Sequence, residues 1–282
     1  KFDLLKNSNI VDMVRANTLI KHYKYFNKAS CRERKIFKAG KYFIGRTDWD
    51  RRITAVLAPE AKYFFGSEIL RKDFYSQMWS YTNSETKIFT STIQANIYKG
   101  LETVLECGVL LKNHNKFDFK WIIAGVSKED EIVEIFEKKS GKKFADYNII
   151  LSGKLNTPDL ISTQLSANIF IHPSHIDNSP NSVCEAMVLG MPVIATYTGG
   201  TGSLLTDKKE GILIQDGDAY SMAGAILELI NNPEYAAELG KNAGIRARER
   251  HSPAAITNDL INIYSKIISR QSNSPGISKP GL

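Results

Sequence analysis

Cysteine is scarce in this chain, and no long apolar run interrupts it. The three cysteines, Cys31, Cys107 and Cys184, are odd in number and far apart. They therefore suggest neither a disulfide framework nor the spacing of a zinc site. No apolar run approaches the roughly 20 residues that a membrane-spanning helix needs. These absences favour a cytoplasmic protein with free thiols.

Histidine is also sparse, and no metal site is expected. The histidines, aspartates and glutamates form no cluster with ligand spacing. His172 lies in an apolar segment, where a buried, packed residue is the simpler interpretation. His175 follows in a polar loop, where it can contact a ligand. No neighbouring residues suggest a catalytic or ligand-binding role for His22, His114 or His251.

Acidic residues are too few to balance the basic ones in the first third of the chain. Residues 1–85 hold 17 Lys and Arg against 9 Asp and Glu, whereas the remainder holds 20 against 21. One interpretation is a solvated basic surface, and the other is a face that contacts anionic lipid or an acidic acceptor. No known nucleic-acid-binding motif accompanies the charge, so we expect no nucleic-acid partner.

Helical and strand patterns alternate along the chain, which predicts an α/β fold with a parallel sheet. The 282 residues, 43% of them hydrophobic, suffice for one to two domains. Residues 1–85 are predicted to be the C-terminal part of an N-terminal, acceptor-side α/β domain that ends at a hinge, TNSET (82–86). Its predicted elements are a helix at 11–38, a strand at 41–45, a helix stopped by Pro59, and a strand at 62–66.

Residues 86–252 are predicted to form a Rossmann-like domain. Ligands of such sheets bind beyond the carboxyl ends of the strands, so the turns after its strands are expected to converge on one cleft. A helix at 253–270 and a flexible tail at 271–282 follow. The predicted strands lie at 87–92, 121–126, 148–153, 169–174, 192–196 and 211–215, and the predicted helices at 99–113, 128–139, 158–165, 182–190 and 219–230.

The turn DNSPNSVCEAM carries the strongest chemical signal. It leads into a helix whose first backbone N–H groups lack partners, which makes an anion site. Asp177 and Glu185 are eight residues apart and can face one cleft, where a carboxylate can accept hydrogen bonds from a vicinal diol. Compensation of the helix dipole is an equal alternative for Glu185. The residues Asn178, Ser179, Asn181 and Ser182 favour turns and N-caps, and Pro180 fixes the backbone approach.

The segment SPNSVCEAMVLGMPVIATYTGG resembles the donor site of glycosyltransferase family 4, whose members are retaining enzymes of the GT-B fold. The resemblance extends over residues 40–270 and includes further motifs in the same order. These are Lys99 with Gly100, Ala124 with Gly125, Gly153, Pro173 with Ser174, Asp177 with Glu185, and Gly199 with Gly200.

The resemblance implies a role for each matching residue. Lys99 neutralises the donor diphosphate, Asp177 contacts the sugar, and Glu185 holds the ribose hydroxyls. A leaving phosphate needs positive charge on any mechanism, although a lone lysine in this place could simply be exposed. Gly153 and Leu155 match the turn that meets the base. The other implied donor contacts are Asn178, Ser179, Asn181, Ser182, Gly199 and Gly200.

The implied activity is transfer of a hexose-type sugar from a nucleoside-diphosphate-sugar to a glycan or lipid-linked acceptor, with retention and without a metal. It suggests cell-surface polysaccharide synthesis, at the inner face of the membrane if residues 1–85 contact anionic lipid. In this fold the helix at 253–270 crosses back to the N-terminal domain. No covalent nucleophile is needed, and no serine elbow is found.

Three departures from the family pattern favour a weaker activity. Asp177 stands where the family has glutamate, and STIQANIY lacks the usual arginine. We expect that about 100 residues of a first domain are absent before Lys1, because the chain is a fragment rather than a protein with a reduced N-terminal domain, and that it binds nucleotide but transfers sugar poorly. The alternative is a non-catalytic nucleotide-binding module that kept the fold. A dehydrogenase is a poor fit, since STIQANIYKG lacks a glycine-rich turn.

Overall fold

The computed structural model describes residues 19–114 and 116–272. Within this part the chain forms two compact units. The small unit comprises residues 19–45 and 51–64, and the sheet unit comprises residues 46–50 and the described residues from 65 onward. No helix of the described residues is long and apolar enough to span a bilayer. The three cysteines are free, as predicted.

The small unit contains a two-stranded sheet and two helices. Its long helix packs back on the first strand, where the Phe37 and Phe43 rings stack with centroids 5.0 Å apart. Of the predicted first helix, residues 11–18 lie outside the described residues. The elements are α2 (Leu19–Ala39), β1 (Tyr42–Gly45), α3 (Asp48–Leu57, which begins in the sheet unit) and β2 (Lys62–Phe65).

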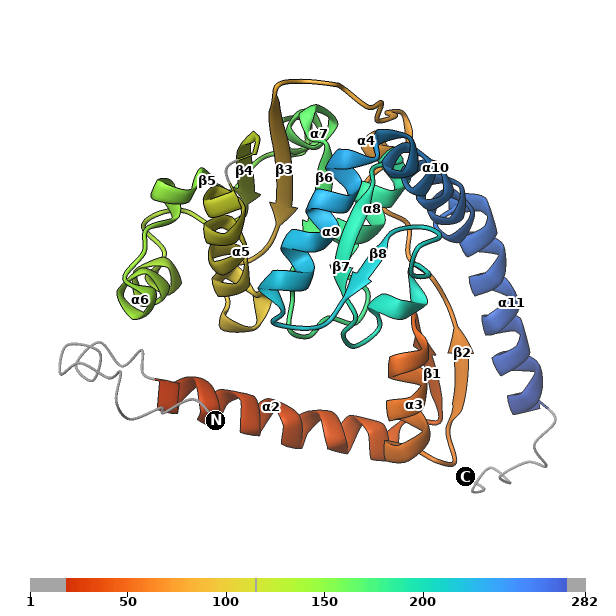
Figure 1. Cartoon of the computed structure of the whole chain (residues 1–282). Helices are drawn as coiled ribbons and strands as arrows, with labels where there is room; N and C mark the ends of the chain where they lie inside the picture. Colours follow the sequence, from red (N-terminus) through yellow and green to blue (C-terminus); the bar gives the residue numbers. More distant parts are fainter. Residues whose placement is uncertain (1–18, 115, 273–282) are drawn as a thin grey trace, which may run out of the picture. The chain divides into compact units, whose positions relative to one another are not determined.

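The sheet unit is built on six parallel strands in the order β5-β4-β3-β6-β7-β8 (Figure 1). The chain starts at the centre, runs outward to β5, returns to the centre at β6 and runs outward again. The loops after β3 and β6 therefore depart in opposite directions from adjacent strands, which opens a crevice at the carboxyl edge. The strands are β3 (Thr86–Thr92), β4 (Asp118–Ala124), β5 (Ile149–Gly153), β6 (Ile169–His172), β7 (Val193–Thr196) and β8 (Ile212–Ile214).

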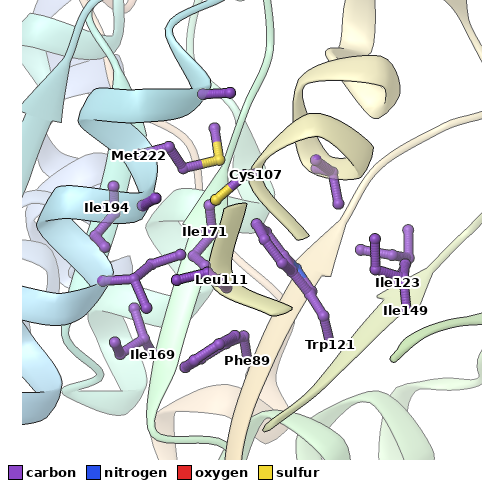
Figure 2. Packing of buried hydrophobic residues seen from close by; sticks show 14 of the residues in the cluster. Phe89, Cys107, Leu111, Trp121, Ile123, Ile149, Ile169, Ile171, Ile194 and Met222 are labelled. Carbon is purple, nitrogen blue, oxygen red and sulfur yellow. The ribbon is translucent and has the colours of Figure 1, made fainter. Parts of the chain in front are cut away.

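Helices cover both faces of this sheet, so the central strands are apolar at successive positions. Ile169 and Ile171 enter one hydrophobic cluster, while Phe170 between them enters the other. This division follows from the alternation of side chains along a strand. Figure 2 shows the first cluster, in which Met222 and Cys107 reach the sheet from two helices.

The helices α5, α6 and α9 contribute to the first cluster, α4, α7 and α8 to the second, and α10 to both. The longer helices are α5 (Leu101–His114), α6 (Glu131–Ser140), α7 (Thr157–Ser166), α8 (Asn181–Leu189), α9 (Ala219–Asn231), α10 (Pro233–Arg250) and α11 (Pro253–Ser272). The short ones are α4 (Lys72–Tyr75) and the 3₁₀ turns η1 (Ile97–Lys99), η2 (Phe144–Tyr147) and η3 (Thr201–Ser203).

In the sheet unit, two helix starts differ from prediction by two or more residues. The helix expected from Lys99 begins at Leu101, because Gly100 has a φ of 73° and separates it from η1. The helix expected from residue 128 begins at Glu131, after Asp130, whose carboxylate accepts from the N–H of Ser127 at 2.7 Å. The predicted tail at residues 271–282 falls largely outside the described residues, and α11 extends to Ser272.

Within the sheet unit, the segment 65–85 packs against α7 and α8. The Trp79 N–H donates to the Leu189 carbonyl at 2.7 Å, and the Trp79 indole donates to the Ala167 carbonyl at 2.6 Å. Phe74 is fully buried among residues of the second cluster. The domain boundary at residue 85 stays a prediction, as does the return of α11 to an N-terminal domain.

Candidate functional site

The ion pair of Lys99 and Asp177 lies at the carboxyl edge of the sheet. Lys99 ends the 3₁₀ turn after β3, and Asp177 lies in the loop after β6. Although the two residues are 78 positions apart, the Lys99 ammonium donates to Asp177 Oδ2 at 2.6 Å. The Lys99 side chain is only 15% exposed, so it is not a freely solvated lysine. The structure brings these two predicted site residues together.

His172 lies under this pair, buried at the end of β6. Its Nε2 is 3.6 Å from Asp177 Oδ2, longer than an ordinary hydrogen bond. Burial lowers the pKa of His172, so the ring is neutral at physiological pH. Burial alone raises the pKa of Asp177, but His172 and Lys99 outweigh it and hold the pKa at about 2. Asp177 is therefore a carboxylate.

The turns that carry Lys99 and Asp177 are fastened to each other. The Tyr98 carbonyl accepts from the His175 N–H at 2.9 Å and from the Ser174 hydroxyl at 3.2 Å. At Gly100 the approach is so close that a Cβ would lie 1.9 Å from the Pro173 carbonyl oxygen. The backbone thus sets the separation of the two functional side chains.

The polar residues before α8 do not provide the side-chain N-cap that their types favour. No side chain caps the helix, because the N-cap residue is Pro180, which has no side-chain acceptor. Asn178 is engaged inside the chain, where its amide donates to Asp50 at 2.9 Å and its oxygen accepts from Thr47. Ser179 is buried, and its hydroxyl has no partner among the described residues.

The N-terminus of α8 retains the properties of an anion site. The backbone N–H groups of Asn181 and Ser182 precede the first intrahelical hydrogen bonds, so the helix itself offers them no acceptor. Asn181 is exposed and Ser182 is half-buried. The positive end of the helix dipole adds to their attraction for phosphate.

Glu185 is held by an arginine that the sequence did not indicate. Arg71 lies between β2 and α4, and it donates from Nε and Nη2 to the two carboxylate oxygens at 2.7 Å each. The hydrogen bond to Glu185 raises the pKa of Arg71. Glu185 pairs with Arg71 and Asp177 pairs with Lys99, so each carboxylate has a cation of its own. Glu185 is thus more than a partner for the helix dipole.

The remaining predicted residues are glycines and one leucine in the surrounding turns. Gly153 has a φ of 67° and exchanges backbone hydrogen bonds with Gly125 and Val126, while Leu155 packs against the second cluster. Gly199 and Gly200 let the turn after β7 approach the site loop. The Gly200 N–H donates to the Asp177 carbonyl at 2.9 Å.

His175 lies between two carboxylates. Its Nδ1 lies 2.6 Å from Asp216 Oδ1, and its Nε2 contacts Glu102 at the start of α5. The bonds to Glu102 and Asp216 outweigh partial burial and raise the pKa of His175 to about 9. The ring is therefore charged at neutral pH. Among the described residues, no three His, Cys, Asp or Glu side chains form a metal-binding group.

The chain matches the family model for group 1 glycosyl transferases over residues 77–246. It is 28% identical over 169 residues to poly(ribitol-phosphate) alpha-N-acetylglucosaminyltransferase of Staphylococcus aureus, covering 59% of this chain and 33% of that protein. It is 27% identical over 121 residues to the capsular polysaccharide biosynthesis glycosyltransferase CapM of Staphylococcus aureus, covering 43% and 31%. The chain thus spans about a third of the length of these relatives.

A solved structure confirms the predicted fold class. A mutant of S. aureus TarM, in complex with fondaparinux, alpha-GlcNAc-glycerol and UDP, superposes with a TM-score of 0.68 at 22% identity. The superposition covers 84% of this chain and 46% of that one. The fold is of the GT-B class, and both relatives are named as sugar transferases, one of them of capsular polysaccharide biosynthesis. With the family model matching well over half of its residues, the chain belongs to the group 1 glycosyltransferases.

Proposed function

We propose that this chain binds a nucleoside-diphosphate-sugar and serves sugar transfer, with retention, to a glycan or lipid-linked acceptor in cell-surface polysaccharide synthesis. The observation that carries the proposal is the Lys99–Asp177 pair at the carboxyl edge of the sheet. A cation for phosphate and a carboxylate for sugar hydroxyls lie together there, and Asp177 belongs to the loop that leads to the N-terminus of α8. The relatives' names support a hexose-type donor.

Each element of the site has a task in this proposal. Lys99 and the α8 N–H groups hold the diphosphate, and they stabilise the negative charge that develops as it leaves. Asp177 orients the sugar, and Glu185 accepts from the ribose. The Gly153–Leu155 turn meets the base. Because Lys99 and the helix supply the positive charge, we propose that donor binding needs no metal.

The test is thermal unfolding with uridine, guanosine and cytidine diphosphates. A diphosphate at 100 times its Kd adds about 2.7 kcal/mol of stability, which raises the Tm by roughly 5–10 °C. Glu185→Gln should weaken binding by about 10-fold or more, because hydrogen bonds to a charged group contribute about 1.5–3 kcal/mol. The matched control is Glu134→Gln, a glutamate exposed on α6.

The same experiment has two outcomes that contradict the proposal. One is the lack of a Tm shift with any of the three diphosphates, and the other is equal binding by the Glu185→Gln and Glu134→Gln variants. Repeating the titration with EDTA tests whether donor binding needs a metal. If it does not, the Kd should be unchanged.

Nucleotide binding without transfer is the second candidate function. It is favoured by the shorter side chain of Asp177, whose charge Lys99 already balances at 2.6 Å. Release of UDP from a UDP-sugar in the presence of the chain distinguishes the two functions. Turnover above the uncatalysed rate supports transfer, and tight binding without any release supports a binding module.

We also propose that the basic N-terminal part contacts anionic lipid at the inner face of the membrane. In the small unit, α2 exposes Tyr25 and Phe26 beside several lysines and arginines. Each such cation adds about 1 kcal/mol near an anionic surface.

The expected result is sedimentation of the chain with phosphatidylserine vesicles. This sedimentation should be lost in high salt and in the double variant Lys28→Glu/Arg32→Glu. The control Lys139→Glu/Lys143→Glu on the sheet unit should still sediment, and equal loss in both variants would contradict a specific face.

A further inference from the structure

Arg71 joins two parts of the site that are far apart in the sequence. Two of its N–H groups bind Glu185 on α8, and its Nη1 donates to the Thr157 hydroxyl at 3.0 Å. Thr157 is the first residue of α7, directly after the turn that contains Gly153 and Leu155. One guanidinium therefore spans the turn assigned to the base and the carboxylate assigned to the ribose.

The hydrogen bonds of the Glu185 carboxylate leave room for a diol. An ionised carboxylate has about four lone-pair sites, and a guanidinium that binds both oxygens takes two of them. Two sites remain, which is the number that the two hydroxyls of a ribose need. Arg71 also lowers the penalty of keeping this charge in a place where the Glu185 side chain is only 6% exposed.

The guanidinium is itself held in a fixed plane. Its carbon lies 4.7 Å from the centroid of the Phe74 ring, and Phe74 is fully buried. Such stacking and the paired hydrogen bonds depend on the planar fork of arginine, which a lysine ammonium cannot reproduce. The position of the Glu185 oxygens is thus determined by Arg71 and the surface on which it stacks.

We propose that Arg71 is a positioning residue for the nucleoside of the donor. It holds the Glu185 carboxylate with two lone pairs directed to the ribose diol, and it fixes the separation between that carboxylate and the turn that meets the base. This inference rests on the proposed function, because it requires that a nucleotide binds at this site.

The experiment compares Kd values for UDP and 2′-deoxy-UDP by calorimetry, with GDP and its 2′-deoxy form measured in parallel. The unchanged chain is expected to prefer the ribonucleotide by about 10-fold. Arg71→Ala should weaken ribonucleotide binding by about 10-fold or more and bring the ribose preference close to one. Arg71→Lys should recover only part of that preference.

Arg248→Ala is the matched control. Arg248 binds the carbonyls of Tyr75 and Gln77, so it fastens the same segment as Arg71 without touching Glu185. It should therefore preserve the ribose preference even if it lowers the Tm. A purely structural role for Arg71 predicts instead that the Arg71 and Arg248 variants lose stability alike and keep the preference.

Two results would overturn the inference while the proposed function stands. One is an unchanged ribose preference in Arg71→Ala. The other is tighter UDP binding in that variant, which would mean that the guanidinium fills the place of the ribose. Failure of the unchanged chain to bind any nucleoside diphosphate is a different result, since it rejects the proposed function itself.

Discussion

Replacing Lys99 with alanine is expected to weaken donor binding strongly. The change removes the ammonium that would neutralise the diphosphate, and it leaves Asp177, whose side chain is 20% exposed, without its close cation. The remaining carboxylate would then repel the ligand. Loss of one charged hydrogen bond weakens affinity by about 10–150-fold. Where transfer is measured, loss of one group that stabilises developing charge lowers the rate by about 10²–10³-fold.

The measurement is the Kd of UDP by calorimetry, together with UDP release from a UDP-sugar. Lys116→Ala, at an exposed lysine of the loop after α5, is the matched control and should bind normally. The double variant Lys99→Ala/Asp177→Asn should regain part of the affinity, because it removes the repelling carboxylate. An affinity of Lys99→Ala equal to that of the control would show that the diphosphate binds elsewhere.

Gly199→Ala is expected to lower both the stability of the chain and its affinity for the donor. Gly199 has a φ of 50°, and a Cβ there would lie 2.0 Å from the Asp177 carbonyl oxygen. The left-handed backbone costs an alanine about 1–2 kcal/mol, and relief of the clash adds about 1–3 kcal/mol. The Asp177 loop must move, so donor affinity should fall together with the Tm.

Gly141→Ala separates these two contributions. Gly141 has a φ of 68°, but a Cβ there would meet nothing within 4 Å. It should therefore show the backbone cost alone, with normal donor binding. Thermal unfolding and UDP titration of both variants provide the check. Equal Tm losses in the two variants would mean that the close approach to Asp177 has no energetic consequence.

The strands, and the edge of the sheet at which the candidate site lies, could be predicted because both depend on local patterns and on a topological rule. Short apolar segments that end in glycine or polar turns predict the strands. Parallel strands then bring the turns after β3 and β6 to one edge. The choice of Lys99 and Asp177 at that edge rests on the resemblance to glycosyltransferase family 4, whereas the ion pair between them depends on side-chain packing that the sequence does not show.

The Arg71–Glu185 pair could not be predicted, because it joins residues 114 positions apart whose relation depends on how residues 65–85 pack. The sequence predicts that these residues belong to another domain.

Helix α10 was not predicted from the sequence, for a different reason. Its buried stripe consists mainly of small residues, with Gly240 and Gly244 packed closely against Gly190, so the hydrophobic pattern is weak.

The junction between the two halves of the sheet affects how the site is held together. One half contains β3, β4 and β5, and the other contains β6, β7 and β8. Lys99 follows β3 of one half, Asp177 and Glu185 follow β6 of the other half, and the two halves join at β3 and β6, where the paired residues are Phe89 with Ile169 and Thr90 with Phe170. Neither half contains a complete site. A nucleotide bound across the junction would act as a clamp, adding its binding free energy to the docking of the two halves. A bound nucleotide is thus expected to make the two halves unfold together, because it contacts both sides of the β3–β6 junction.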